Sequence, residues 1–206
     1  TNAGKIAAMS AYSEQSIYSK CSVDATINGG RARLASMFVC WAQSSCSFSE
    51  CWVEGDVTCN SIAAGFIVVD ISSNVSNCYS KAGVHVVYVI PPLNNTNSAH
   101  GFMSSLNTAT ITNCYSTGLV EKNYSAGTTA ITGFLGSNTS GTVTNSYWDT
   151  QTSGQVTSAG GTGKTTTEMK EGAINAATIY VGWSTDIWDE LTNADYPQLK
   201  NNYEDD

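Results

Sequence analysis

A motif that recurs roughly every thirty residues constrains the fold of this 206-residue chain more than any other feature. One position marks the copies, and in the three best copies it is a Cys or Ser that follows Asn and precedes Tyr. The marker falls at Cys21, Cys51, Cys78, Cys114 and Ser146. In each of the three best copies a Phe lies twelve residues before the marker. A loose period of this length is typical of stacked structural repeats.

Each copy has the composition of short strands. An apolar or aromatic residue lies three positions before the marker, small and β-branched residues fill the rest, and Gly and Asn mark the corners. Such units bury no apolar face alone, so they stack edge on edge around one core. The sequence predicts an all-β fold, a β-solenoid (β-helix) of roughly five coils over residues 1–150, with degenerate, Cys-rich N-terminal coils. Residues 151–206 are predicted to form a C-terminal cap with a short helix and a Trp/Tyr-Pro closing segment.

Stacking explains the seven cysteines better than a metal site does, because no pair has C-x₂-C spacing and neither histidine stands at ligand spacing. Equivalent positions in neighbouring coils lie one strand spacing apart, within the Cα separation of a disulfide. Cys21–Cys51 and Cys78–Cys114 are therefore candidate disulfides. A column of reduced residues is the alternative, since Ser146 takes the same position.

The Asn before the marker also repeats. Asn tolerates the left-handed backbone conformation of a corner, and stacked Asn side chains form amide hydrogen-bond ladders. The sequence predicts both for Asn77, Asn113 and Asn145.

The stretch TSAGGTGKTTTEMK at residues 157–170 looks like a phosphate-binding loop. If Gly163-Lys164-Thr165 ended that motif, residue 158 would be Gly, and it is Ser158. Thr165 and Glu168 have the spacing of a capping box, which instead predicts a helix over about 166–178. The residues expected to close the open end of the stack are Met169, Ala173 and Ile174 of this helix, together with Trp183, Trp188 and Tyr196-Pro197.

Residues 65–200 resemble the GLUG-type repeat regions of bacterial and archaeal surface proteins and adhesins. The resemblance rests on GF…TITNCYSTGLV at 101–120, on GFLGSNTSGTVTNSYWDTQTSG at 133–154 and on the closing segment at 182–200. Cysteines replace the usual Gly, Asn and Ser over 36–60. The resemblance implies extracellular display in an adhesive or structural role, and it carries no catalytic residues.

Charge and cysteine use bear on the compartment and the partners. The chain has 9 basic and 17 acidic residues without a basic patch, which argues against a nucleic-acid partner. No apolar run approaches the length of a membrane span. Disulfides favour an extracellular or cell-surface location, and a start at Thr1 without a signal peptide fits an exported, processed product or an excised fragment. Candidate glycosylation sites are Asn74, Asn94, Asn123 and Asn138.

An enzyme acting on acidic polysaccharides would group carboxylates on one face, or place a basic side chain beside bound Ca²⁺. Residues 60–148 contain only Asp70 and Glu121 as acids, and these do not recur at equivalent positions. The sequence therefore predicts no enzyme, no catalytic, cofactor-binding or metal-binding residues, and no cofactor.

The sequence favours a non-enzymatic surface protein that acts in adhesion or as a structural module. Its candidate contact loop spans 91–100 and includes Pro91, Asn94, Asn95 and His100, facing a glycan or a protein of a host or cell surface. A bare solvated loop is the alternative.

Two other functions remain open. One is a self-assembling filament subunit that pairs with itself through the solenoid ends or the apolar N-terminal segment. The other is an ice-binding solenoid, which needs a flat ladder of Thr. The aligned threonines are Thr110, Thr112, Thr142 and Thr144, while Ser73 and Ser76 take two matching places in the preceding copy.

Overall fold

The computed structural model describes residues 4–30, 32–87, 97–123, 130–170, 179–189 and 195–200. Within these residues the chain has an all-β fold, and every ladder between its strands is parallel. The strands form four sheets, which we call A to D. The predicted all-β class with stacked parallel strands is thereby confirmed.

Sheets A and B have five strands each. Sheet A contains β1 (Lys5–Ala7), β5 (Leu34–Ser36), β9 (Ile62–Ala64), β14 (Ser98–His100) and β19 (Ala130–Thr132). Sheet B contains β2 (Ser13–Glu14), β6 (Val39–Gln43), β10 (Ile67–Ile71), β15 (Met103–Asn107) and β20 (Leu135–Asn138).

Sheet C has five strands and sheet D has eight. Sheet C contains β3 (Ile17–Ser19), β7 (Ser47–Ser49), β11 (Asn74–Ser76), β16 (Thr110–Thr112) and β21 (Thr142–Thr144). Sheet D contains β4 (Ser22–Asn28), β8 (Trp52–Cys59), β12 (Tyr79–Ser80), β13 (Gly83–Val86), β17 (Tyr115–Ser116), β18 (Val120–Lys122), β22 (Tyr147–Asp149) and β23 (Thr162–Lys164).

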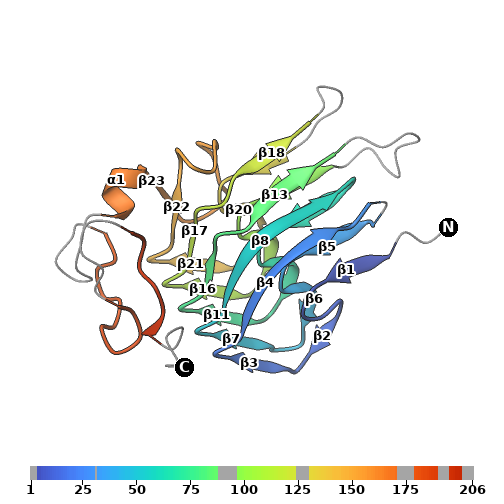
Figure 1. Cartoon of the computed structure of the whole chain (residues 1–206). Coiled ribbons are helices and arrows are strands. Elements are labelled where there is room, and N and C mark those ends of the chain that lie inside the picture. The colour runs from blue at the N-terminus through green and yellow to red at the C-terminus, as the bar shows by residue number, and fades with distance from the viewer. Residues whose placement is uncertain are drawn as a thin grey trace, which may run out of the picture.

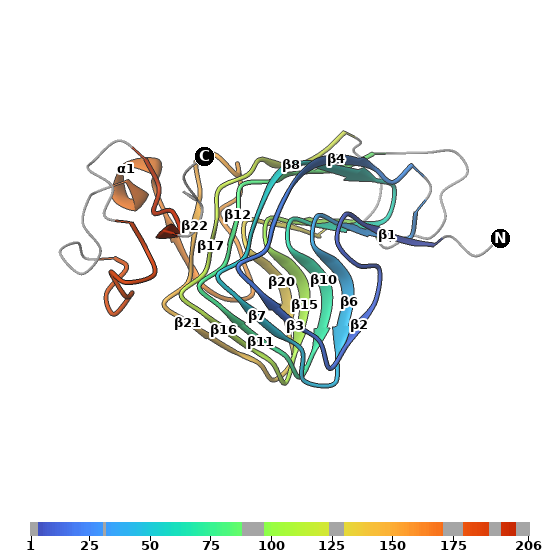
Figure 2. The same ribbon diagram turned by 60° about the horizontal axis from the view of Figure 1, so that its bottom comes forward.

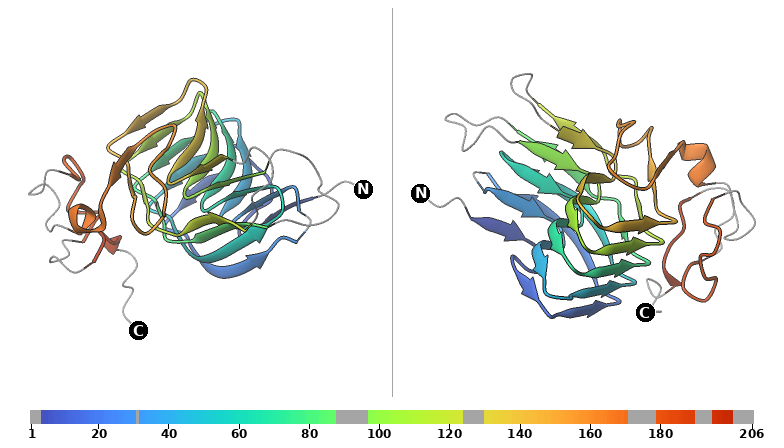
Figure 3. Two further views of the ribbon diagram at one scale, coloured as in Figure 1. Left: turned by 90° about the horizontal axis from the view of Figure 1, so that it is seen from above. Right: turned by 180° about the vertical axis from the view of Figure 1, so that it is seen from behind.

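The chain passes through sheets A, B, C and D in that order and then returns to sheet A, so that each passage lies beside the previous one (Figures 1 and 2). The register places the five marker residues one above another, because each directly precedes a strand of sheet D and those strands pair at their first residues. The views from above and behind show the passages as successive layers, with β1 and the C-terminal segment on opposite sides (Figure 3).

The corner between sheets C and D requires a left-handed residue in every passage. The five residues there have φ between 45° and 54°, and they are Lys20, Glu50, Asn77, Asn113 and Asn145. Asn tolerates this conformation because its short polar side chain bonds locally. The Nδ2 group of Asn113 donates to Oδ1 of Asn77 at 3.4 Å, so the predicted conformation is confirmed for all three Asn residues and the amide ladder for this pair.

A column of stacked phenylalanines runs through the core. Its members are Phe38, Phe66, Phe102 and Phe134, all fully buried. Successive ring centroids lie 4.8, 5.0 and 4.7 Å apart, and the rings are within 15° of parallel. The Phe that recurs in the sequence is therefore the element that joins the interiors of successive passages.

Segment 157–164 covers the last passage. The N–H of Gly133 donates to the carbonyl of Thr157 at 3.1 Å, that of Ala159 donates to the carbonyl of Leu135 at 2.8 Å, and β23 pairs with β22. Strand stacking thus reaches Lys164, beyond the predicted boundary at residue 150.

The aromatic closing segment packs elsewhere, on the outer face of sheet D. It covers a column of outward side chains formed by Trp52, Tyr79, Tyr115 and Tyr147. The residues buried against this column include Met169, Trp183, Trp188 and Tyr196. The Tyr115 hydroxyl donates to the Pro197 carbonyl at 2.7 Å. The expectation that these residues close the end of the stack is wrong, because segment 157–164 already covers that end and the outward aromatic column needs a cover of its own.

Candidate functional site

The outer face of sheet C is a regular array of uncharged side chains, which are Ser, Thr or Asn except for the exposed Ile17. In each of its five strands the middle residue points into the core and the two flanking residues point outward. The first outward column is Ile17, Ser47, Asn74, Thr110 and Thr142. The second is Ser19, Ser49, Ser76, Thr112 and Thr144. All of them are exposed or half-buried, and none is charged.

Hydrogen bonds within the array join neighbouring strands. The Thr110 hydroxyl donates to Oδ1 of Asn74 at 2.7 Å, and Ser49 donates to Ser19 at 3.1 Å. The register corrects one prediction, because Asn74, not Ser73, stands beside Thr110, while Ser76 stands beside Thr112 as expected. Ser73 is buried, at 1% exposure, so it lies outside the array. The alternation of hydroxylated residues around the apolar position was the signal that could have given this register.

The outer face of sheet D has the opposite character. Its exposed part carries Asp24, Glu54, Asp56 and Glu121. His85 on β13 lies between two of these carboxylates, with Nε2 3.0 Å from Asp56 and Nδ1 3.0 Å from Glu121. These three residues lie on strands of three successive passages, so the His ties the passages together. Sequence reasoning missed this cluster because its members are far apart in the chain.

The four Cys markers form a column at the inner edge of sheet D. Cys51, Cys78 and Cys114 are fully buried and Cys21 is half-buried. The N–H of Cys51 lies 3.4 Å from Sγ of Cys78, which shows how closely neighbouring members approach. All seven cysteines are free thiols in this structure, so the alignment is confirmed and the pairing stays a prediction.

Oxidation of the column is expected to give the bridges Cys21–Cys51 and Cys78–Cys114. A bridge between Cys51 and Cys78 would leave the outer two cysteines too far apart to pair. Burial and the adjacent thiols raise the pKa of Cys51 and Cys78, so little thiolate forms in the folded protein and the bridges should form during folding. Peptide mapping without reductant, after refolding with oxidised glutathione, checks this.

Cys78→Ser provides the matched variant for that experiment. It should leave the Cys21–Cys51 bridge intact and release Cys114 as a free thiol. A bridge between Cys51 and Cys114 in the variant, or between Cys51 and Cys78 in the parent chain, would contradict the pairing.

His100 is a buried residue at the end of strand β14 and does not lie on an exposed contact loop. It is 2% exposed, its Nδ1 atom shares a 2.8 Å hydrogen bond with the Thr132 hydroxyl, and burial lowers its pKa to about 4. The cavity beside it, of about 280 Å³, is lined by both apolar and polar residues, which are Ile62, Asn97, Ser98, Ser104, Ala130, Gly136 and Ser137. The other residues of the predicted contact loop, Pro91, Asn94 and Asn95, lie outside the described residues.

The structure describes three of the four candidate glycosylation sites (sequons). Asn74, Asn123 and Asn138 are exposed, as glycosylation would require, and Asn94 lies outside the described residues. Asn74 is also a member of the sheet C array, so a glycan there would cover the centre of that face.

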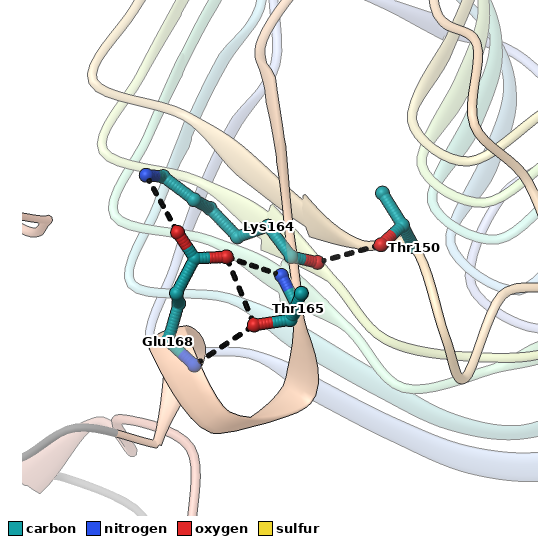
Figure 4. A network of polar contacts seen from close by, with 4 residues as sticks. All are labelled: Thr150, Lys164, Thr165 and Glu168. Atoms are coloured by element: carbon teal, nitrogen blue, oxygen red, sulfur yellow. Dashed lines mark hydrogen bonds and ion pairs between the residues drawn. The ribbon is translucent and has the colours of Figure 1, made fainter.

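The stretch that looks like a phosphate-binding loop is a strand followed by a helix cap (Figure 4). α1 (Thr166–Met169) begins with the predicted capping box: the Glu168 N–H donates to the Thr165 hydroxyl at 3.2 Å, and the Thr165 N–H donates to the Glu168 carboxylate at 2.8 Å. The bonds that the N–H and the hydroxyl of Thr165 donate to this carboxylate lower the pKa of Glu168. The Nζ atom of Lys164 lies 3.2 Å from the same carboxylate. The lysine that would bind phosphate in a P-loop is thus engaged by Glu168, and residues 171–178 of the predicted helix lie outside the described residues.

Comparison of the chain with protein families, curated proteins and solved structures finds no match. Among the described residues, no three His, Cys, Asp or Glu side chains gather as a metal site, and no helix is long and apolar enough to cross a membrane.

Proposed function

We propose that this chain is a non-enzymatic module of an extracellular surface protein, built as a β-solenoid of about five coils, that acts by contact through the outer face of sheet C. The solenoid supplies a rigid support, because each coil hydrogen-bonds to its neighbours and shares the Phe column with them. Adhesion or a structural role at the cell surface follows from such a module.

The observation that carries the proposal is the absence of charge from the outward side chains of sheet C, in a chain whose net charge is −8. The neighbouring face of sheet D carries carboxylates and is partly covered by the aromatic segment. A neutral partner could therefore bind to the broad, rigid face of sheet C without removing water from charged side chains.

Two further features support an extracellular setting. Residues 65–200 resemble GLUG-type surface repeats in their sequence, and the column of cysteines has the spacing of inter-coil bridges. The exposed sequons at Asn123 and Asn138 are compatible with glycans in such a setting, although the Asn138 side chain hydrogen-bonds to Gly141, directly beside the sheet C array.

The proposal is tested by adsorption of the full chain to solid surfaces and to a glycan array, beside a variant with Thr142→Lys at the edge strand of the threonine-rich part of the face. We expect the parent chain to be retained by at least one neutral surface and the variant to be released. Equal retention of both chains everywhere, or turnover of an anionic polysaccharide by the parent chain, would overturn the proposal.

A filament subunit is the second candidate, because the first strand of every sheet is paired on one side only within the described residues. These strands are β1, β2, β3 and β4. Exposed strand edges recruit other strands, and the same passage exposes Ile6, Met9 and Tyr12. Electron microscopy and sedimentation over a range of protein concentrations decide between the candidates: fibres support the filament, and monomers that adsorb support the contact module.

A further inference from the structure

The outer face of sheet C has the geometry of a two-dimensional lattice. Neighbouring residues of one column lie one strand spacing apart, about 4.8 Å. The two columns are separated by two residues along each strand, about 6.6 Å at the rise of an extended chain. The lattice is maintained over all five strands, because the register between them has no shift.

The side chains of the C-terminal half are the stiffest members of the lattice. Thr110, Thr112, Thr142 and Thr144 form a rectangle of β-branched residues, whose χ1 angles are restricted. Each presents a hydroxyl and a methyl group at a fixed place. A partner with its own lattice can meet many such groups at once, and weak contacts then add up over the face.

Side-chain hydrogen bonds at both ends of the strands join one pair of neighbouring passages of sheet C, those that contain β11 and β16. Isolated sheets twist, and side-chain ladders are one of the few devices that keep them flat over many strands. Sheet C has the amide ladder of Asn77 and Asn113 at one edge. At its other edge the hydroxyls of Ser72 and Thr108 share a 2.8 Å hydrogen bond. The Phe column lies behind the sheet in the core.

The chemistry of this face indicates which kind of crystalline solid could bind to it. Minerals are ionic, and the face carries no charge to meet them. Crystalline polysaccharides are bound by flat aromatic side chains that stack on sugar rings. The aromatic columns of this chain lie in the core or under the C-terminal segment, and none of the outward side chains of sheet C is aromatic. Ice is neutral, made of hydroxyl-type donors and acceptors, and repeats along its crystal planes at distances of this order.

From these observations we propose that the outer face of sheet C binds the surface of ice crystals. The inference rests on the proposed function, since it names the partner of the same face. The four threonines, on the last two strands of the sheet, make the main contact, and the Ser and Asn residues of the preceding strands extend it. A lysine introduced at Thr142 holds its own hydration shell and breaks the lattice, whereas a lysine at Thr26, an exposed Thr on sheet D, leaves it intact.

To test this, solutions of the unglycosylated full chain are frozen slowly. The amount of protein captured in the ice and the thermal hysteresis of the solution are then measured. We expect the parent chain and Thr26→Lys to enter the ice, and Thr142→Lys to be captured about tenfold less, as removal of about 1.4 kcal/mol of contact free energy would produce. Circular dichroism should show that all three chains fold alike.

Exclusion of the folded parent chain from ice would overturn the inference, as would equal capture of the two lysine variants. Failure of the ice inference remains distinguishable from failure of the proposed function. If the parent chain avoids ice but adsorbs to a glycan or another solid, and Thr142→Lys does not, the contact face stands and its partner is wrong. A glycan on Asn74 in native material would also overturn the ice inference, because it would cover the face.

Discussion

Asp70→Asn is expected to raise the free energy of unfolding above pH 7 by about 3 kcal/mol. Asp70 lies on β10 between Ala42 and Leu106, its side chain is fully buried, and neither carboxylate oxygen has a hydrogen-bond partner within the described residues. Burial raises its pKa from 3.8 to about 6, and nearby Ser73 offsets only part of this effect. A shift of about two pKa units corresponds to about 3 kcal/mol.

The sign follows from proton linkage. Because the folded state holds the Asp70 proton more tightly than the unfolded state does, the stability that this proton contributes is full below pH 3.8 and is lost as pH rises through about 6. Urea unfolding of the parent chain should show this loss between pH 4 and pH 7. Asn mimics the protonated acid, so the Asp70→Asn chain should lack this component of the loss.

Asp24→Asn is the matched control, because Asp24 is exposed on β4. Because Asp24 stands opposite Glu54, its neutralisation should change the stability at neutral pH by at most about 1 kcal/mol, well below the effect expected at Asp70. A loss of stability in Asp70→Asn at neutral pH would mean that the carboxylate is stabilised by contacts that burial alone does not describe.

The stacking of the strands could be predicted from the sequence because the copies of the repeat align with one another in the same register. The markers and the recurring Phe fixed which residues stand above one another, and the structure confirms these alignments. The left-handed Asn corners followed from the conformational tolerance of a single residue type. Each of these inferences required only local chemistry and the period.

The features that could not be predicted depend on whether a side chain points into the core or outward. The sequence does not show which way the column of Tyr79, Tyr115 and Tyr147 points, and in the structure it points outward and is buried by the C-terminal segment. The contact face was missed at Asn74 because a one-residue error in register exchanges inward and outward positions. The ion cluster of His85 joins residues from three passages and has no signal in any single copy.

Phe102→Ala should destabilise the chain by about 3–5 kcal/mol, the usual effect of removing a buried aromatic ring. The ring of Phe102 lies between those of Phe66 and Phe134, at 5.0 and 4.7 Å, and is inaccessible to solvent. In a stacked array each unit contacts only its neighbours, so loss of a central ring weakens both junctions. Urea unfolding followed by circular dichroism gives the magnitude.

Phe134→Ala makes the comparison specific to the stack, because Phe134 ends the column and has one stacked partner where Phe102 has two. An aromatic pair contributes about 0.5–1.5 kcal/mol beyond its burial, so Phe134→Ala should cost about 1 kcal/mol less than Phe102→Ala. Leu119→Ala, at a side chain that is 45% exposed, should cost little and serves as the control for truncation itself. If Phe102→Ala and Phe134→Ala cost the same, burial alone accounts for the column and ring stacking adds nothing. If Phe102→Ala unfolds only one side of the stack, with two transitions in place of one, the passages are stabilised by their nearest neighbours and not by one cooperative core.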